Sequence, residues 1–149
     1  MITLRIAQEN DAESIALHNQ AMALETENKT LDWEIVFTGV ESVLADPAKG
    51  FYLVAVSEGE VLGNLMITYE WSDWRNCNLW WFQSVYLRPE IRKQKVFSQM
   101  FAWIKEKAKA DGVKELRLYV EKENVNAQLV YKAMGMGESH YLMFDMVVG

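Results

Sequence analysis

The sequence predicts one α/β domain over residues 1–149, in which a mixed, mostly antiparallel sheet is flanked by helices. Three observations support this fold class. The chain has 149 residues, of which 50% are hydrophobic, and this is the size of one ordinary domain with a full core. Apolar residues alternate in some segments and recur at helical spacing in others. Three strand-like segments follow one another between residues 51 and 87, as in an antiparallel meander.

The chain begins with a strand and two helices. Residues 2–7 alternate like a strand, and Asn10 or Asp11 then caps a helix. The polar segment 25–30 ends this helix. A second helix is predicted over residues 32–45, where apolar side chains recur at helical spacing.

The three strands of the meander come next. Residues 51–57 and 61–70 flank a short turn at residues 58–60, which indicates a hairpin. A turn-like segment then leads to a third strand over residues 78–87.

The second half of the chain alternates helices and strands. Helices are predicted over residues 95–110 and 124–133, and strands over residues 115–121 and 139–148. The full order is β-α-α-β-β-β-α-β-α-β. The strand–helix–strand unit between residues 79 and 121 should place its two strands parallel.

Composition and charge exclude several classes of function. A net charge of −6 argues against nucleic acid as a partner. No apolar run is long enough to span a membrane, and the N-terminus lacks the pattern of a signal peptide. The lone Cys77 excludes an internal disulfide and fits a reducing, cytoplasmic location. His18 and His140 have no second ligand at metal-binding spacing, so no metal site is expected.

The segment at residues 83–109 is the most informative part of the chain. An apolar strand runs through a basic loop directly into an amphipathic helix. A helix start carries unpaired backbone N–H groups and the positive end of the helix dipole, so it attracts phosphates. The loop adds cationic side chains, which are Arg88, Arg92, Lys93 and Lys95. We therefore expect a phosphate-binding site, the alternative being a solvated basic helix start.

The order of elements and this loop resemble the GNAT family of acyl-CoA-dependent N-acetyltransferases. Residues 85–97, VYLRPEIRKQKVF, resemble the acetyl-CoA signature of the family, Q/R-x-x-G-x-G/A, with Arg92 at its first position. A second match, at the spacing of the family, consists of Asn124, Ala127, Tyr131 and Gly135. The resemblance covers nearly the whole chain.

The resemblance implies acetyl-CoA as a co-substrate and also implies where it binds. The fourth and fifth strands would splay apart to admit the pantetheine arm, whose amides would pair with the backbone near Val85 and Leu87. The loop from Arg92 to Phe97 would hold the pyrophosphate. The implied cofactor-binding residues are Val85, Leu87, Arg92, Lys93, Gln94, Lys95, Val96, Phe97 and Asn124.

The loop departs from the signature at two positions. Lys95 stands where the signature has glycine, and Phe97 stands where it has glycine or alanine. If this backbone position has an ordinary helical φ, Lys95 adds charge toward the phosphates. If the position requires a positive φ, a non-glycine residue costs on the order of 1–3 kcal/mol, equivalent to roughly tenfold or more in affinity.

Acyl transfer from a thioester to an amine leaves two proton transfers for the protein to assist. An alkyl amine with a pKa near 10.4 must lose a proton, which costs about 4–5 kcal/mol at pH 7. The departing thiolate gains from a proton donor. By resemblance Tyr131 is this general acid, the alternative being an ordinary core tyrosine.

The general base is open. Many relatives carry an acid on the fourth strand, where this chain has Gln83 and Ser84, and neither is a base at neutral pH. Alternation puts Gln83 on the same face as Trp81, Val85 and Leu87. Its amide would therefore orient a water or the acceptor, or else be satisfied by backbone.

Two groups of carboxylates could serve as the base, and they also suit a cationic acceptor. Glu25 and Glu27 lie where the first helix gives way to a loop, a region that in the family forms part of the acceptor wall. Glu70 and Asp73 bracket Trp71, and aromatic rings and carboxylates together bind amines. The alternative is a solvated turn. We expect a small cationic amine as the acceptor, such as a polyamine, an aminoglycoside or a lysine-like molecule.

The leading hypothesis is thus an acetyl-CoA-dependent N-acetyltransferase acting on the primary amine of a small cationic acceptor. The alternative is a non-catalytic protein of the same fold that binds a ligand or partner, because Lys95 and Gln83 depart from the family pattern. A homodimer that packs exposed tryptophans against a second chain is compatible with both.

Overall fold

A computed structural model describes residues 1–149, which form two compact units, residues 1–118 and 119–149. No helix in it is long and apolar enough to cross a bilayer. The first unit consists of β1 (Thr3–Ile6), α1 (Ala12–Glu27), α2 (Trp33–Ala45), β2 (Phe51–Ser57), β3 (Glu60–Ser72), β4 (Cys77–Leu87), α3 (Val96–Ala110) and β5 (Leu116–Arg117), with short 3-10 turns at Glu9–Asp11 and Pro89–Ile91. The second unit contains α4 (Val125–Ala133).

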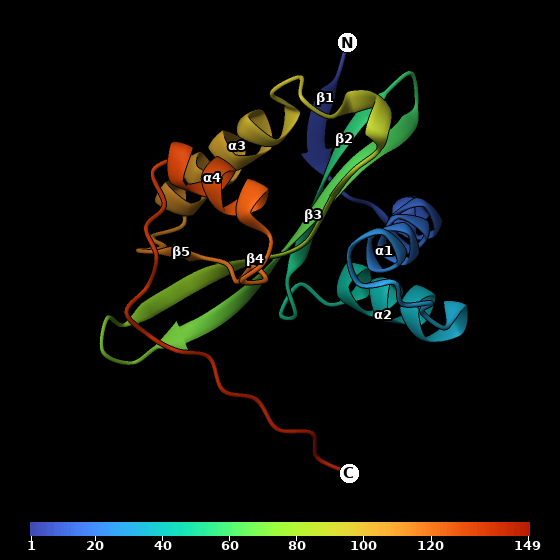
Figure 1. Ribbon diagram of the computed structural model, residues 1–149. Helices are drawn as coiled ribbons and strands as arrows, with labels where there is room; N and C mark the ends of the chain where they lie inside the picture. The colour runs from blue at the N-terminus through green and yellow to red at the C-terminus, as the bar shows by residue number, and fades with distance from the viewer. The chain divides into compact units, whose positions relative to one another are not determined.

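The five strands form one sheet in the order β1-β2-β3-β4-β5 (Figure 1). Neighbouring strands are antiparallel from β1 to β4, and β4 and β5 are parallel. The mixed, mostly antiparallel sheet, the meander and the parallel strand–helix–strand unit are therefore confirmed.

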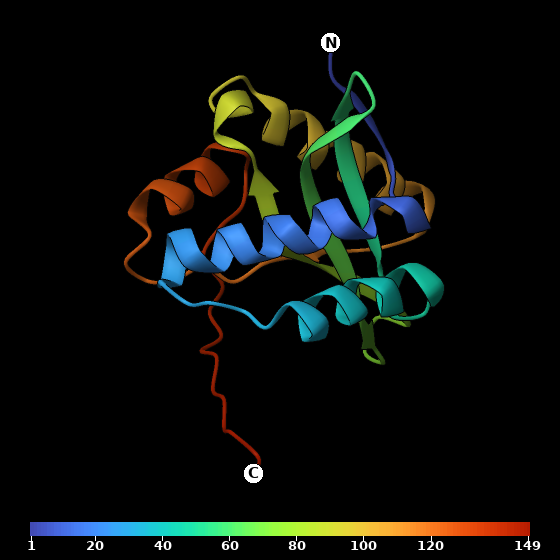
Figure 2. The same ribbon diagram turned by 90° about the vertical axis from the view of Figure 1, so that its right-hand side faces the viewer.

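Helices cover both faces of this sheet. α1 and α2 lie on one face and α3 lies on the other (Figure 1), and α1 crosses the strands (Figure 2). On the first face, Ile15 of α1 and Val40 of α2 pack with Tyr52 of β2 in the core. On the second face, the ring of Phe82 stacks on Phe101 of α3 with centroids 5.3 Å apart. We call these faces the α1 face and the α3 face.

Local interactions account for where several elements begin and end. Asp32 accepts a hydrogen bond from the backbone N–H of Ile35 over 3.1 Å and so caps α2. Asn28 ends α1 in the left-handed region, with φ 52°. Glu58 and Gly59 both have positive φ, as the two-residue turn of the β2–β3 hairpin requires.

β4 and β5 pair over a short length only. Trp80 pairs with Leu116 and Trp81 pairs with Arg117, and β5 ends there. The strand predicted over residues 115–121 is therefore much shorter than expected. The end of β4 beyond Trp81 has no pairing with β5, because β5 ends at Arg117.

The second unit confirms one prediction and contradicts another. Asn124 caps α4, because its side chain accepts a hydrogen bond from the N–H of Ala127 over 3.2 Å. The strand predicted over residues 139–148 is absent. Its large apolar side chains, from Tyr141 to Val148, are 64–91% exposed. Alternation alone does not make a strand, because a strand needs a hydrogen-bonded neighbour, and this segment has none in the sheet.

Candidate functional site

A cavity of about 260 Å³ lies where the end of α1 meets the end of β4. It brings together residues that are far apart in the sequence, including four that the sequence singled out. The lining consists of Met22, Glu25, Thr26, Val85, Tyr86, Leu87 and Arg92. We call this the β4 cavity.

Arg92 is the most constrained side chain of the β4 cavity. Its Nη2 donates to Glu25 Oε1 over 2.9 Å, and its Nε donates to the Leu87 carbonyl over 2.8 Å. Its guanidinium carbon lies 5.4 Å from the centre of the Tyr86 ring. Arg92 is thus held against the end of β4 by the ion pair with Glu25, the hydrogen bond to the Leu87 carbonyl and the cation–π contact with Tyr86.

Glu25 acts in this cavity as an anion. The hydrogen bond from the Tyr86 hydroxyl, followed by that from Arg92, lowers the pKa of the Glu25 carboxyl below its ordinary value. Burial raises the pKa of Tyr86, and the Glu25 charge raises it further. A carboxylate with a lowered pKa is a weak proton acceptor, so Glu25 is better suited to holding a cation than to acting as general base. Sequence analysis missed Tyr86, because nothing in a run of strand residues marks the one that meets Glu25.

The start of α3 is open to an anion. Lys95 occupies the capping position with no side-chain cap, and the first turn contains no acidic residue. The first backbone N–H groups of a helix have no partner within it. The Val96 side chain is buried and the Phe97 ring packs at 6.4 Å from Phe101, so these two predicted residues can serve a ligand through backbone N–H groups.

The loop before α3 has a left-handed backbone at two lysines. Lys93 has φ 62° and Lys95 has φ 64°. Of the two alternatives for Lys95, an ordinary helical φ is therefore wrong. Both lysines are exposed, and neither forms an ion pair. Between them, Gln94 Nε2 donates a hydrogen bond to the Glu90 carbonyl over 2.9 Å. Two unpaired cations beside an uncapped helix start fit a diphosphate.

Gln83 and Glu70 lie on the α1 face of the sheet, outside the lining of the β4 cavity. Gln83 Nε2 donates a hydrogen bond to Thr68 Oγ1 over 2.6 Å. The partner of the Gln83 amide is therefore a side chain and not the backbone. Glu70 accepts from Trp81 Nε1 over 2.8 Å and from Arg117 Nη1 over 3.2 Å. Glu70 is thus one member of an ion pair.

The predicted orientation of Gln83 relative to the end of β4 is wrong. β4 carries a bulge at residues 84–85, which both stand opposite Leu65 of β3. An extra residue reverses the alternation of side chains along a strand. Gln83 therefore shares the α1 face with Tyr86, whereas Leu87 lies on the α3 face.

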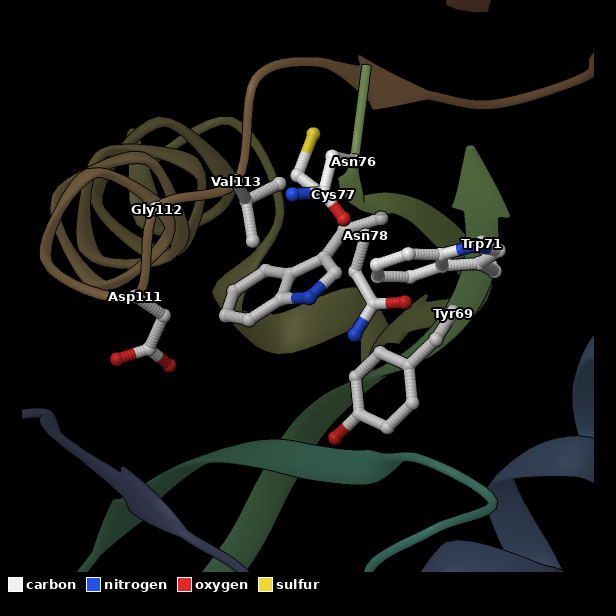
Figure 3. Close-up of a pocket in the computed structure, with 9 residues that line it drawn as sticks. Tyr69, Trp71, Asn76, Cys77, Asn78, Asp111, Gly112 and Val113 are labelled. Atoms are coloured by element: carbon white, nitrogen blue, oxygen red, sulfur yellow. The ribbon is translucent and has the colours of Figure 1, made fainter. Parts of the chain in front are cut away.

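A second cavity, of about 430 Å³, lies between the β3–β4 hairpin and the loop that follows α3. Figure 3 shows Tyr69 and Trp71 on one side of it and Asp111 on the other. Burial raises the pKa of Tyr69, and the Asp111 charge adds to this rise. Of the predicted aromatic and acidic cluster, Trp71 lines this cavity, whereas Glu70 lies on the opposite face of the sheet.

Tyr131 lies in α4, within the second unit. Burial raises the pKa of its phenol. A tyrosine phenol is protonated at neutral pH even at its ordinary pKa, and the rise keeps it so, as a general acid requires. Asn124, which the resemblance assigns to cofactor binding, uses its side-chain oxygen to cap this helix.

The unpaired end of β4, the β4 cavity and the open start of α3 fit a transferase that binds an acyl-CoA. Residues 5–136 match the sequence model of the Acetyltransferase (GNAT) family, and the chain belongs to this family. Aminoalkylphosphonate N-acetyltransferase of Salmonella typhimurium is 27% identical over 138 residues, which are 93% of this chain and 86% of that protein.

Solved structures show the same fold. The crystal structure of "a possible acetyltransferase" from Clostridium difficile 630 is 41% identical, with a TM-score of 0.94 over 99% of this chain and 98% of that chain. A predicted acetyltransferase with acetyl-CoA from Clostridium acetobutylicum is 14% identical, with a TM-score of 0.80 over 97% and 96% of the two chains. The predicted family, enzyme class and co-substrate are thus confirmed: the protein is an N-acetyltransferase that uses acetyl-CoA.

Proposed function

We propose that the protein transfers the acetyl group of acetyl-CoA to the primary amine of a small cationic acceptor. One observation carries the proposal: the β4 cavity, with Val85, Leu87 and Arg92, adjoins a loop that ends at the uncapped start of α3. The Salmonella typhimurium relative is named for an aminoalkylphosphonate, which is an amine of small size.

The residues of the loop fit the charged part of the co-substrate. Lys93 and Lys95 supply positive charge, and the first N–H groups of α3 supply hydrogen-bond donors. The unpaired edge of β4 near Val85 and Leu87 offers backbone groups to the pantetheine amides. Bound acetyl-CoA supplies the thioester that the amine attacks.

Two side chains assist the proton transfers in this proposal. Tyr131, whose phenol is protonated at neutral pH, donates a proton to the departing thiolate. Gln83, held by Thr68, orients the acceptor amine or a water that takes its proton.

Glu25 and Glu70 attract the cationic acceptor. Glu25 is an anion at the edge of the β4 cavity, and Glu70 lies on the α1 face of the sheet. Carboxylates favour positively charged molecules, as does the net charge of −6.

The experiment is a transfer assay on the purified chain. Free thiol and acetylated product are followed with acetyl-CoA and a panel that contains a polyamine, an aminoglycoside, lysine and an aminoalkylphosphonate. We expect turnover with at least one amine and none with its trimethylated counterpart, which keeps the charge but has no N–H. Binding of acetyl-CoA without product from any amine would instead favour the non-catalytic alternative. The strained backbone of Lys95 supports that alternative.

We also propose a cytoplasmic homodimer. The exposed apolar segment 141–148 and the tryptophans Trp71 and Trp74, which are 61% and 92% exposed, support an interface. The lone, unpaired Cys77 supports a reducing location. Sedimentation velocity should give a dimer for the full chain and a monomer for a chain that ends at His140. A monomer at every concentration of the full chain would contradict the dimer.

A further inference from the structure

The bulge in β4 is a strained feature of the chain. Ser84, its first residue, has φ 51°, in the left-handed region that favours glycine. A residue with a side chain pays about 1–2 kcal/mol to adopt this region. The surrounding structure must therefore hold Ser84 in place.

Asn64 of β3 provides one hold on the bulge. Its side chain is fully buried, and its Nδ2 donates to the carbonyl oxygen of Ser84 over 3.0 Å. A carbonyl can only accept, so the amide nitrogen must face Ser84 and the amide oxygen must face the other way. That oxygen, Oδ1, lies 2.7 Å from Nδ1 of His18 in α1.

His18 is fixed in one neutral form by its two partners. Since Asn64 Oδ1 accepts, His18 Nδ1 carries the proton, and His18 Nε2 accepts from Nε of Arg88 over 3.2 Å. Burial is the main cause that lowers the pKa of His18. Arg88, which follows β4, also pairs with Glu60 at the start of β3.

These contacts hold β4 at the bulge and just beyond it. Asn64 holds the carbonyl of Ser84, and the His18 ring lies 5.2 Å from the ring of Tyr86. Arg88 then anchors the chain beyond the strand. The bulge in turn decides which face each later side chain of β4 occupies, including Tyr86 and Leu87 of the β4 cavity.

We propose that the buried pair of Asn64 and His18 is a positioning device that fixes the bulge at Ser84 and so orients the end of β4 that receives acetyl-CoA. Neither residue lines the β4 cavity, so both act through Ser84 and the strand that follows it. The inference rests on the proposed function, because it assigns the end of β4 to the co-substrate.

The first test is Asn64→Leu, which keeps the branched shape of the side chain and removes both hydrogen bonds. We expect kcat/KM for acetyl-CoA to fall on the order of tenfold to a hundredfold, through both KM and kcat, because small displacements of a binding strand have large effects on rate. Adding Ser84→Gly should restore much of this loss, because glycine adopts the left-handed region without the help of Asn64. Ser84→Gly alone should change kcat/KM little.

Val40→Ala is the control for lost stability. Val40 is buried in the same core but lies in α2, away from the bulge. Assayed well below its own Tm, this variant should keep kcat/KM for acetyl-CoA. An equal loss of kcat/KM in both variants, or a loss in Asn64→Leu that Ser84→Gly does not reduce, would overturn the proposal.

Two variants of His18 provide a second test of the proposal if Asn64→Leu does not fold. His18→Asn retains an N–H donor toward Asn64, whereas His18→Leu retains none. We expect His18→Leu to lose more kcat/KM than His18→Asn at matched stability. Equal losses would overturn the proposal.

Amide hydrogen exchange at residues 83–86 gives a readout that requires no ligand. Asn64→Leu should accelerate exchange there relative to Val40→Ala, and Ser84→Gly should slow it again. Unchanged exchange in Asn64→Leu would overturn the role in holding the bulge. If the exchange pattern is as expected but the native protein does not bind acetyl-CoA, the proposed function is overturned. The claim that the bulge orients the co-substrate falls with it, whereas the role of Asn64 in holding the bulge stands.

Discussion

Nη2 of Arg92 donates a hydrogen bond to the carboxylate of Glu25 over 2.9 Å and so joins the first residue of the anion-binding loop to the end of α1. The positive charge that the signature places toward a pyrophosphate is therefore neutralised in the free protein. A pyrophosphate bound at the proposed site would compete with Glu25 for the same guanidinium.

Glu25→Gln should strengthen the binding of acetyl-CoA, because it releases Arg92 from an ion pair. Both side chains are 41% exposed, and such a pair is worth about 0.2–1 kcal/mol. The expected gain in affinity is thus at most about fivefold. Calorimetric titration with acetyl-CoA measures it.

Glu27→Gln is the matched control. Glu27 lies on the same helix end and pairs with Lys29 at 3.2 Å rather than with Arg92. The Glu27→Gln substitution removes the same charge from nearly the same place, and it should leave the affinity for acetyl-CoA almost unchanged. Equal gains in the two variants would mean that net charge, and not the release of Arg92, causes the effect.

Lys95→Gly should stabilise the protein. Lys95 has φ 64°, and glycine adopts this conformation without the cost of about 1–2 kcal/mol that a side chain pays. We expect the Tm to rise by roughly 2–4 °C for each kcal/mol gained. Differential scanning calorimetry checks this.

Lys95→Ala separates backbone strain from charge. It removes the ammonium group and keeps the strain, so it should not raise the Tm. If both variants bind acetyl-CoA more weakly than the native protein, the lysine side chain contributes to the site. Tighter binding by Lys95→Gly alone would show that the native loop is impaired by its strain.

His18 should make the stability of the protein sensitive to mild acid. Its pKa is lowered in the folded state, chiefly by burial and also by the charge of Arg88, against the opposing effects of the Asn64 hydrogen bond and the Glu90 charge. Below about pH 6.5 the unfolded chain therefore binds a proton that the folded protein does not. The free energy of unfolding should fall from about pH 6.5 down to the lowered pKa of His18.

Urea unfolding between about pH 7.5 and pH 5 measures this slope. His18→Asn carries no titrating ring, so its stability should fall less steeply over the same window. Other groups, including His140, are common to both proteins and cancel in the comparison. Parallel curves for the two proteins would contradict the role of His18.

Tyr131→Phe should reduce turnover and spare the affinity for acetyl-CoA. The phenol is protonated at neutral pH, and loss of a general acid costs about 10²–10⁴-fold in rate. Steady-state kinetics with the best amine of the panel, beside a calorimetric titration, gives both quantities. Tyr119→Phe, a change of the same kind outside α4, should leave turnover unchanged.

The sequence predicts those parts of the fold that short-range patterns specify. β2 has the predicted bounds, Phe51–Ser57, and Asp32 and Asn124 cap helices by side-chain hydrogen bonds. Alternation, helical spacing and capping are properties of neighbouring residues, so they can be read without a structure.

The errors concern features that depend on contacts between distant residues. Alternation puts Gln83 and Leu87 on one face, and the bulge, which Asn64 holds from another strand, separates them. The segment 139–148 alternates like a strand and has no partner in the sheet. The positive φ of Lys95 likewise has no sequence signal apart from the family resemblance, because lysine rarely adopts it.

Titration of the protein with acetyl-CoA tests most directly whether the end of β4 and the start of α3 form its binding site. We expect saturable binding at one site, accompanied by a rise in Tm, and clearly weaker binding when Lys93 and Lys95 are both changed to alanine. The absence of heat and of any rise in Tm at millimolar acetyl-CoA, or an affinity that the two substitutions leave unchanged, would contradict this site.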